Sequence, residues 1–336
     1  MSPKRYIIPV FIPHLGCPND CVFCNQRKIS GEILPATPAT VRGAVEEALE
    51  KIPAERSAEL AFYGGSFTAI PESEQTELLE AVQPFMRSGR IGEIRLSTRP
   101  DALDEPCLER LKKFGVRTIE LGAQSMDDGV LEAAGRGHTA ADTEYASKLI
   151  KKQGFNLVLQ MMTGLPGDSE EKALETAKKL ITLKPDAVRV YPTVILRDTP
   201  LFSLWKAGKY REHTVSEAVN LGAKLFRLFT EAGISIIRFG LNPSDELSGG
   251  EAVGGAYHPA LGELVRSEYY LNLARELISK SEHGSQLVLG VNRGCVSLMT
   301  GQKRKNIQAL MSEFKLKSLK VRETKLPAGK FVIILQ

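Results

Sequence analysis

Short apolar runs alternate along the first 200 residues with longer segments whose apolar positions recur every three or four residues. The short runs are typical of β-strands, and the longer segments have the period of amphipathic helices. Leu157–Met162 is apolar on both faces, which indicates a parallel sheet covered on both sides. The predicted strands are Tyr6–Ile12, Leu60–Tyr63, Glu93–Ser97, Thr118–Gly122, Leu157–Met162 and Ala187–Pro192. The predicted helices are Ala39–Ile52, Glu72–Met86, Leu103–Phe114, Thr139–Gln153 and Ser169–Leu183.

Six such β/α units predict an α/β fold, an incomplete TIM-type (β/α)6 barrel, although a doubly wound open sheet has the same periodicity. Each predicted strand ends in polar or glycine-rich residues, as at Gly64-Gly-Ser66 and Gly122-Ala-Gln124. Because the carboxyl ends of parallel strands meet at one edge, we expect these residues to assemble into a site there.

The alternation stops near residue 213, so the sequence predicts a barrel over residues 1–213 and a smaller α+β extension over residues 214–336. The extension is predicted to contain two helices, Val215–Ala232 and Pro259–Lys280, with a glycine-rich loop between them. Its predicted strands are Ile234–Phe239 and four short ones near residues 286–291, 295–299, 316–322 and 330–335.

Composition narrows the class of protein. The chain has 336 residues, 43% of them apolar, and a net charge of +4, which excludes a disordered or fibrous protein. We expect a cytoplasmic protein, because the sequence has no membrane-spanning apolar stretch and does not begin like a signal peptide. The charge is uneven, with +7 in residues 302–336 and −3 in the rest. The basic residues within 303–330 could contact RNA, or they could protect an exposed strand edge.

Three of the five cysteines lie within eight residues, in Cys17-Pro-Asn-Asp-Cys21-Val-Phe-Cys24, directly after the first predicted strand. Three thiolates can hold three corners of an iron–sulfur cubane and leave the fourth iron open. Alternatively, the same loop could bind zinc with His14 as a fourth ligand. Two further cysteines cannot hold a second cluster by themselves. Of these, Cys107 is expected to be a buried apolar residue, and Cys295 would be a buried thiol in a predicted short strand.

The cysteine spacing, with Phe23 before the last cysteine, resembles the signature of radical S-adenosylmethionine (SAM) enzymes. Further motifs follow in an order similar to that of the Elongator catalytic-subunit branch of this superfamily and, more distantly, to oxygen-independent coproporphyrinogen oxidase. They are Phe62-Tyr-Gly-Gly-Ser-Phe-Thr68, Ser97-Thr-Arg-Pro-Asp101, Glu120-Leu-Gly-Ala-Gln-Ser125, Gly135-Arg-Gly-His138, Met161-Met-Thr-Gly-Leu-Pro-Gly167, Pro185-Asp-Ala-Val-Arg-Val-Tyr-Pro-Thr193 and Leu204-Trp-Lys-Ala-Gly-Lys-Tyr210.

This resemblance implies one 4Fe–4S cluster and SAM as cofactors. It assigns the cluster to Cys17, Cys21 and Cys24. It also implies contacts to SAM. Phe23 would flank the adenine and Gln124 would bond the ribose, while the backbone of Gly64, Gly65 and Ser66 would receive the methionine amino group. Arg136 or Arg189 would pair with the SAM carboxylate, and Ser97 and Gln160 occupy two further positions that contact the cofactor. Tyr191 alternates with Arg189 on the sixth strand, so it would face the substrate if that face is the barrel interior. The resemblance also makes Cys295 a candidate hydrogen donor or methyl carrier, as an alternative to a buried structural thiol.

The implied reaction is reductive cleavage of SAM to methionine and a 5′-deoxyadenosyl radical, which abstracts a hydrogen atom from the substrate. The Elongator-like branch implies a tRNA or other RNA substrate and an electron donor such as flavodoxin or ferredoxin. Acetyl-CoA use is not expected, because 336 residues leave no room for Elongator's acetyltransferase domain. A small metabolite such as a tetrapyrrole, or a peptide, is the alternative substrate. A non-enzymatic, metal-stabilised RNA-binding protein is the alternative class.

Overall fold

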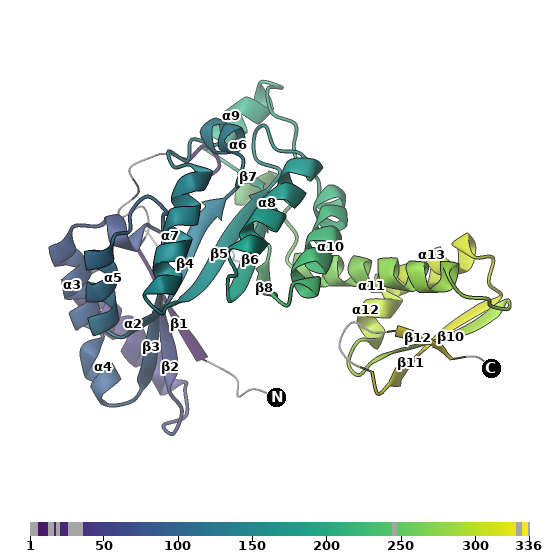
Figure 1. Ribbon diagram of the computed structural model, residues 1–336, viewed down its shortest axis with the longest axis horizontal. Helices are drawn as coiled ribbons and strands as arrows, with labels where there is room; N and C mark the ends of the chain where they lie inside the picture. The colour runs from purple at the N-terminus through teal and green to yellow at the C-terminus, as the bar shows by residue number, and fades with distance from the viewer. Residues whose placement is uncertain are drawn as a thin grey trace.

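The computed structural model describes residues 6–12, 17, 21–25, 36–243, 247–326 and 331–334. Its main element is a curled, fully parallel sheet of seven strands in the order β1-β2-β3-β4-β5-β6-β8 (Figure 1). The strands are β1 Tyr6–Phe11, β2 Ala58–Tyr63, β3 Ile91–Thr98, β4 Val116–Gln124, β5 Asn156–Thr163, β6 Ala187–Pro192 and β8 Ser235–Phe239. The predicted α/β partial barrel is therefore confirmed, with one strand more than the six expected.

Helices cover the outer face of this sheet, and alternation along each strand separates the two faces. Outward positions such as Phe62, Leu96 and Leu121 are buried in one large apolar core beneath the helices. Inward positions carry charged or polar residues, among them Arg95 and Glu120. The helices along the barrel are α2 Pro38–Glu50, α3 Glu72–Glu80, α4 Gln83–Arg87, α5 Glu105–Lys113, α6 Asp128–Ala133, α7 Ala140–Lys152, α8 Glu170–Thr182 and α10 Val215–Glu231.

Two expectations about the barrel are corrected. The single helix predicted over Glu72–Met86 is two helices, α3 and α4, because Pro84 lacks a backbone N–H and is tolerated only in the first turn of α4. The strand predicted within the extension, at residues 234–239, pairs with β6 and completes the main sheet. The division of the chain at residue 213 remains a prediction.

The α+β extension is confirmed in outline. Near the strand ends lies a two-stranded antiparallel sheet of β7 Val194–Leu196 and β9 Ala252–Gly255, with α9 Pro200–Lys206 and the short turn η2 Leu247–Glu251. The C-terminal module follows, comprising α11 Leu261–Ser279, β10 Gln286–Asn292, α12 Val296–Thr300, η3 Gln302–Arg304, α13 Lys305–Glu313, β11 Ser318–Thr324 and β12 Phe331–Ile334. It lies to one side of the barrel (Figure 1), with α11 packed against α10.

The strand predicted at residues 295–299 is wrong, because this segment forms α12. The segment lies between Gly294 and Gly301, both in the left-handed region, and its five residues are too few for periodicity to separate a strand from a helix. In the described part of the chain, no helix is long and apolar enough to cross a membrane.

Candidate active site at the carboxyl ends of the strands

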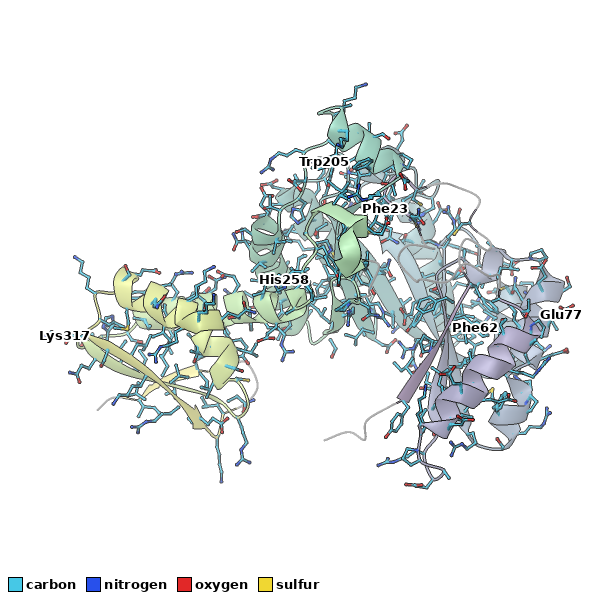
Figure 2. The ribbon with its side chains drawn as sticks, turned by 180° about the vertical axis from the view of Figure 1, so that it is seen from behind. Phe23, Phe62, Glu77, Trp205, His258 and Lys317 are labelled. Atoms are coloured by element: carbon cyan, nitrogen blue, oxygen red, sulfur yellow. The ribbon has the colours of Figure 1, made fainter. Side chains whose placement is uncertain are left out.

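The cysteine loop is attached to the strand-end face of the barrel by backbone hydrogen bonds on both sides. The Val22 amide donates to the Ala134 carbonyl at 3.1 Å, and the Leu201 amide donates to the Val22 carbonyl at 2.8 Å. Phe23 packs against two apolar clusters, one from α6 and the β5 end and one around Leu201 and Tyr210. Figure 2 shows Phe23 close to Trp205 of α9. The loop is thus held between α6 and α9.

The three cysteines differ in exposure, since Cys21 is buried whereas Cys17 and Cys24 are half-buried. The Cys24 amide donates to the Cys21 carbonyl at 3.0 Å, and Arg136 Nη1 lies 3.3 Å from Cys21 Sγ as a donor. Among the residues that the structure describes, no three His, Cys, Asp or Glu side chains converge as a metal site. His14, the alternative zinc ligand, lies outside the described residues. Three soft thiol donors beside a cation nevertheless suit an iron–sulfur cluster better than a hard metal ion.

Arg136 joins the cysteine loop to the end of β4. Its Nη2 donates to the Gly122 carbonyl at 2.8 Å, and Gln160 Nε2 donates to Gln124 Oε1 at 3.3 Å. A Cβ on Gly122 would lie 2.8 Å from Gln124 Nε2 and 3.3 Å from Arg136 Nη2. Glycine is therefore required for the close approach of these two side chains.

Gln124 is itself unusual, because its φ of 62° places a non-glycine residue in the left-handed region. The β4–β5 register shifts between Gly122 and Gln124. Such strain is tolerated where the surrounding structure fixes it, frequently at functional sites. Four sequence-predicted residues, Cys21, Gln124, Arg136 and Gln160, are thus brought into one connected group.

The glycine turn after β2 is also at the strand-end edge. Gly64 has a φ of 102°, which only glycine adopts readily, and Gly65 is half-buried beside it. Ser66 is buried, with its Oγ 3.0 Å from Thr98 Oγ1, and Ser97 Oγ donates to the Phe62 carbonyl at 3.3 Å. The two serine hydroxyls are thus committed to holding the β2 and β3 ends together, which leaves the turn's backbone for close ligand approach.

An unpredicted group, the interior ion network, lies on the inner face of the sheet and consists of Glu59, Arg95, Glu120 and Arg189. Arg95 donates to both carboxylates, through Nε to Glu59 Oε1 and through Nη1 to Glu120 Oε1, each at 2.7 Å. Arg189 donates to Glu120 through Nε at 2.7 Å. Two arginines against two glutamates leave this network neutral. Each of these strands carries a charged residue at an inward position between apolar neighbours, as Arg95 lies between Ile94 and Leu96, and this was the signal that could have revealed the network.

Arg189 is occupied by this network. Besides Glu120, it donates to Tyr63 Oη at 2.9 Å and to Tyr191 Oη at 3.5 Å. Burial raises the pKa of both Tyr63 and Tyr191, so their phenols stay protonated at neutral pH. The contact with Arg189 places Tyr191 on the inner face of the sheet. This is the face on which the sequence predicts a substrate-facing residue.

A second unpredicted group lies at the end of β5. Tyr210 Oη donates to the Gly164 carbonyl at 2.6 Å, and His213 Nε2 lies 3.3 Å from Thr163 Oγ1. Asp168 accepts from the Gly164 amide at 2.8 Å. Burial raises the pKa of Asp168 to about 6 and lowers that of His213. The polar residues after β5 in the sequence carried a weak signal for this group.

Cys295 and Cys107 lie apart from the residues just described. Cys295 immediately precedes α12 in the C-terminal module, to one side of the strand ends (Figure 1), where Tyr270 Oη donates to its Sγ at 3.0 Å. Cys107 is buried on α5, and burial raises the pKa of its thiol to about 11. The structure therefore does not bring Cys295 to the candidate site.

A thiol-bearing loop over the end of a parallel half-barrel is the arrangement expected of a radical SAM enzyme, and the sequence comparison agrees. Residues 11–180 match the Radical SAM superfamily, and residues 185–270 match the Radical_SAM C-terminal domain. The chain belongs to the radical SAM superfamily. It is an enzyme whose cofactors are a 4Fe–4S cluster and SAM.

Curated relatives are similar over part of the chain. The "tRNA uridine(34) acetyltransferase" of Methanocaldococcus jannaschii is 29% identical over 256 residues, 64% of this chain and 47% of the relative. Human "Elongator complex protein 3" is 31% identical over 186 residues, 49% of this chain and 34% of that one. The "Uncharacterized protein MJ0486" of M. jannaschii is 32% identical over 232 residues, 65% and 70% of the two chains. The chain thus spans about half the length of the acetyltransferase relatives it matches.

Solved structures support the fold. The archaeal Methanocaldococcus infernus Elp3 with an N-terminal deletion superimposes with a TM-score of 0.62 at 23% identity, covering 81% of this chain and 63% of that one. Coproporphyrinogen III oxidase from Escherichia coli gives a TM-score of 0.52 at 18% identity, covering 69% and 54%. At these identities the likeness establishes the half-barrel fold alone.

Proposed function

We propose that this chain is a radical SAM enzyme that modifies tRNA. The observation that carries the proposal is the connected group of Cys21, Arg136, Gln124 and Gln160 at the strand ends of a half-barrel. Relatives named as tRNA uridine acetyltransferases and Elongator complex protein 3 support the choice of tRNA. Similarity to these relatives supports tRNA modification in general. The chemical change that this chain makes to the tRNA is part of the proposal.

In this proposal Cys17, Cys21 and Cys24 would hold the 4Fe–4S cluster, and SAM would bind beside it through its amino and carboxylate groups. Together the reduced cluster and SAM would supply a carbon-centred radical able to abstract an unactivated hydrogen atom. The Gly64–Ser66 backbone receives the methionine amino group, Gln124 binds the ribose and Phe23 flanks the adenine. Ser97 and Gln160 support these contacts from neighbouring strand ends.

Arg136 is the better partner for the SAM carboxylate. Its guanidinium lies 3.3 Å from the cysteine sulfur next to which SAM would bind, whereas Arg189 is engaged by Glu120, Tyr63 and Tyr191. Releasing Arg189 would leave Glu120 buried with one partner fewer, which is costly. Arg189 instead orients Tyr191 toward the substrate.

The barrel interior offers hydrogen-bonding groups that suit a nucleobase. The interior ion network is neutral, and the phenols of Tyr63 and Tyr191 lie beside it. A neutral base needs uncharged hydrogen-bonding groups of this kind. We further propose that some of the basic residues within 303–330 contact the RNA, that flavodoxin or ferredoxin supplies the electron, and that the enzyme is cytoplasmic.

The proposal is tested with anaerobically reconstituted protein. We expect about four irons and four sulfides per chain, and 5′-deoxyadenosine formation from SAM after dithionite reduction. Cys21→Ala should lose the cluster, while Cys107→Ala, outside the loop, should retain it. Zinc without sulfide, or a full cluster that yields no 5′-deoxyadenosine with any reductant, contradicts the radical assignment. Mass spectrometry of tRNA nucleosides with and without the gene then tests the substrate, since an unchanged nucleoside profile contradicts tRNA modification.

A further inference from the structure

The three-stranded sheet of the C-terminal module has one covered face and one uncovered face. Its strand order is β11-β10-β12, with β10 parallel to β11 and antiparallel to β12. Leu287, Leu289 and Val291 of β10 pack into a core formed with α11, α12 and α13. All three helices lie on this side of the sheet (Figure 1), so among the described elements none covers the opposite face. We call that opposite face the outer sheet face.

Alternation and register give the composition of the outer sheet face. It consists of Gln286, Val288, Gly290 and Asn292 of β10, Ser318, Lys320, Arg322 and Thr324 of β11, and Val332 and Ile334 of β12. Lys320 and Arg322 are exposed. The described strands place no carboxylate on this face. Glu323 has the opposite parity, and it accepts from the Gly294 amide at 2.9 Å at the strand end. The face therefore carries two cations, several amide or hydroxyl side chains and three apolar ones, of which Val288 is buried between its neighbours.

A glycine at the centre of the sheet shapes this face. A Cβ on Gly290 would lie 2.8 Å from Val332 Cγ1 and 2.9 Å from Thr324 Cγ2. Because Gly290 has no side chain, its neighbours lean over it and form a low apolar strip beside the cationic strand. Val332 remains 37% exposed, which is high for a valine in a strand.

We propose that the outer sheet face binds the sugar-phosphate backbone of the tRNA substrate, through Lys320 and Arg322 to successive phosphates and through Asn292 to a ribose hydroxyl. This inference rests on the proposed function and deepens it. Lys320 and Arg322 project from the same side of one strand at a separation of about 6.6 Å, which suits neighbouring phosphates. Asn292 lies opposite Thr324 in the β10–β11 register, at the end of the same face. Its side-chain amide is an uncharged group of the kind that contacts 2′-hydroxyls.

Charge complementarity favours RNA as the occupant. Residues 302–336 carry +7 while the remainder carries −3, so attraction of a polyanion is concentrated on this module. The module's sheet also lies beyond residue 270, where the match to the superfamily's C-terminal domain ends. The outer sheet face thus lies outside the part of the chain that the superfamily models match.

The experiment compares two double charge reversals in the reconstituted full chain. Lys320→Glu/Arg322→Glu changes the outer sheet face. Lys315→Glu/Lys317→Glu makes the same change in charge in the segment before β11, and Figure 2 shows Lys317 at the far end of the module. Binding of unmodified tRNA is measured by fluorescence anisotropy across a range of salt concentrations. We expect the first variant to bind on the order of 10-fold or more weakly and to lose about one to two units of salt slope. The control should change binding about 2-fold or less.

The possible outcomes separate this inference from the proposed function. If both variants bind tRNA equally weakly, the effect is one of net charge and the outer-face site is overturned. Unchanged tRNA binding by both variants would overturn it as well. Formation of 5′-deoxyadenosine without RNA should be the same in both variants and the parent protein. If the parent forms none, the proposed function fails whatever the binding data show. If the first variant binds tRNA normally but accepts electrons more slowly from a flavodoxin, the face is a protein-docking surface and the RNA assignment is wrong.

Discussion

Glu120 is the residue on which the barrel interior depends. It is 3% exposed and accepts hydrogen bonds from Arg95, Arg189 and Tyr63. These donors come from three different strands, so one carboxylate ties β2, β3, β4 and β6 together beneath the candidate cofactor site. A buried carboxylate is tolerated there only because both arginines compensate its charge.

Removing that charge should therefore destabilise the protein strongly. Glu120→Gln keeps the size of the side chain but leaves two buried guanidinium groups with one carboxylate between them. We expect the free energy of unfolding to fall by about 3–5 kcal/mol, measured by urea denaturation. Glu47→Gln is the matched control, because Glu47 pairs with Lys51 on the exposed surface of α2. Its unfolding midpoint should not change measurably. A similar small effect for both variants would show that the interior ion network is not a structural unit.

Local features of the candidate site could be predicted from the sequence, whereas long-range contacts could not. The cysteine spacing is local, so the sequence alone predicts Cys17, Cys21 and Cys24 as the cluster ligands, and this stays a prediction. Most barrel strands were predicted to within two residues, because their apolar faces recur regularly. The pairing of Arg189 with Glu120 could not be predicted, since it joins residues 69 positions apart and depends on how the sheet curls. Without that contact, Arg189 and Arg136 are equal candidates for the SAM carboxylate.

At the scale of elements, the end of β5 and the loop before α10 are fitted closely together. Gly164 has a φ of 74°, and a Cβ at this position would overlap the Cβ and ring of His213. Tyr210, from the same loop, donates to the Gly164 carbonyl. The loop therefore rests directly on the backbone at the strand end. Its position was not predictable, because nothing in the local pattern relates residue 164 to residue 213.

Gly164→Ala should disturb this contact in addition to straining the backbone. Gly154 is the matched control, since it has a φ of 81° but no atom within 4 Å of the position that a Cβ would take. We expect Gly154→Ala to cost about 1–2 kcal/mol, from the left-handed conformation alone. Gly164→Ala should cost a further 1–3 kcal/mol or so through overpacking. Calorimetric unfolding of the two variants measures the difference, and equal losses would mean that the loop moves aside freely.

At the scale of the whole molecule, α10 joins the barrel to the C-terminal module. One of its faces packs near β8 and the other against α11, and Arg227 of α10 forms an ion pair with Glu276 of α11. Gly222 lies at the closest approach, because a Cβ there would lie 2.7 Å from both Phe239 Cζ and Val265 Cγ2. The barrel and the module are thus in contact through a helix that has no side chain at the crossing point. If this junction is rigid, it fixes the position of the outer sheet face relative to the strand ends.

Gly222→Ala tests whether this junction is rigid. Gly43→Ala is the control, because Gly43 is exposed on α2 with nothing within 4 Å of its Cβ position. Replacing an exposed helical glycine should stabilise the protein by about 0.5–1 kcal/mol. At Gly222 the same helical gain is outweighed by overpacking of about 1–3 kcal/mol, so the variant should be less stable than the parent. If Gly222→Ala is instead as stabilising as Gly43→Ala, α11 can shift away from α10, and the module is not held in a fixed orientation. A stable variant that still binds tRNA but modifies it more slowly would show that the junction sets the distance between the outer sheet face and the radical site.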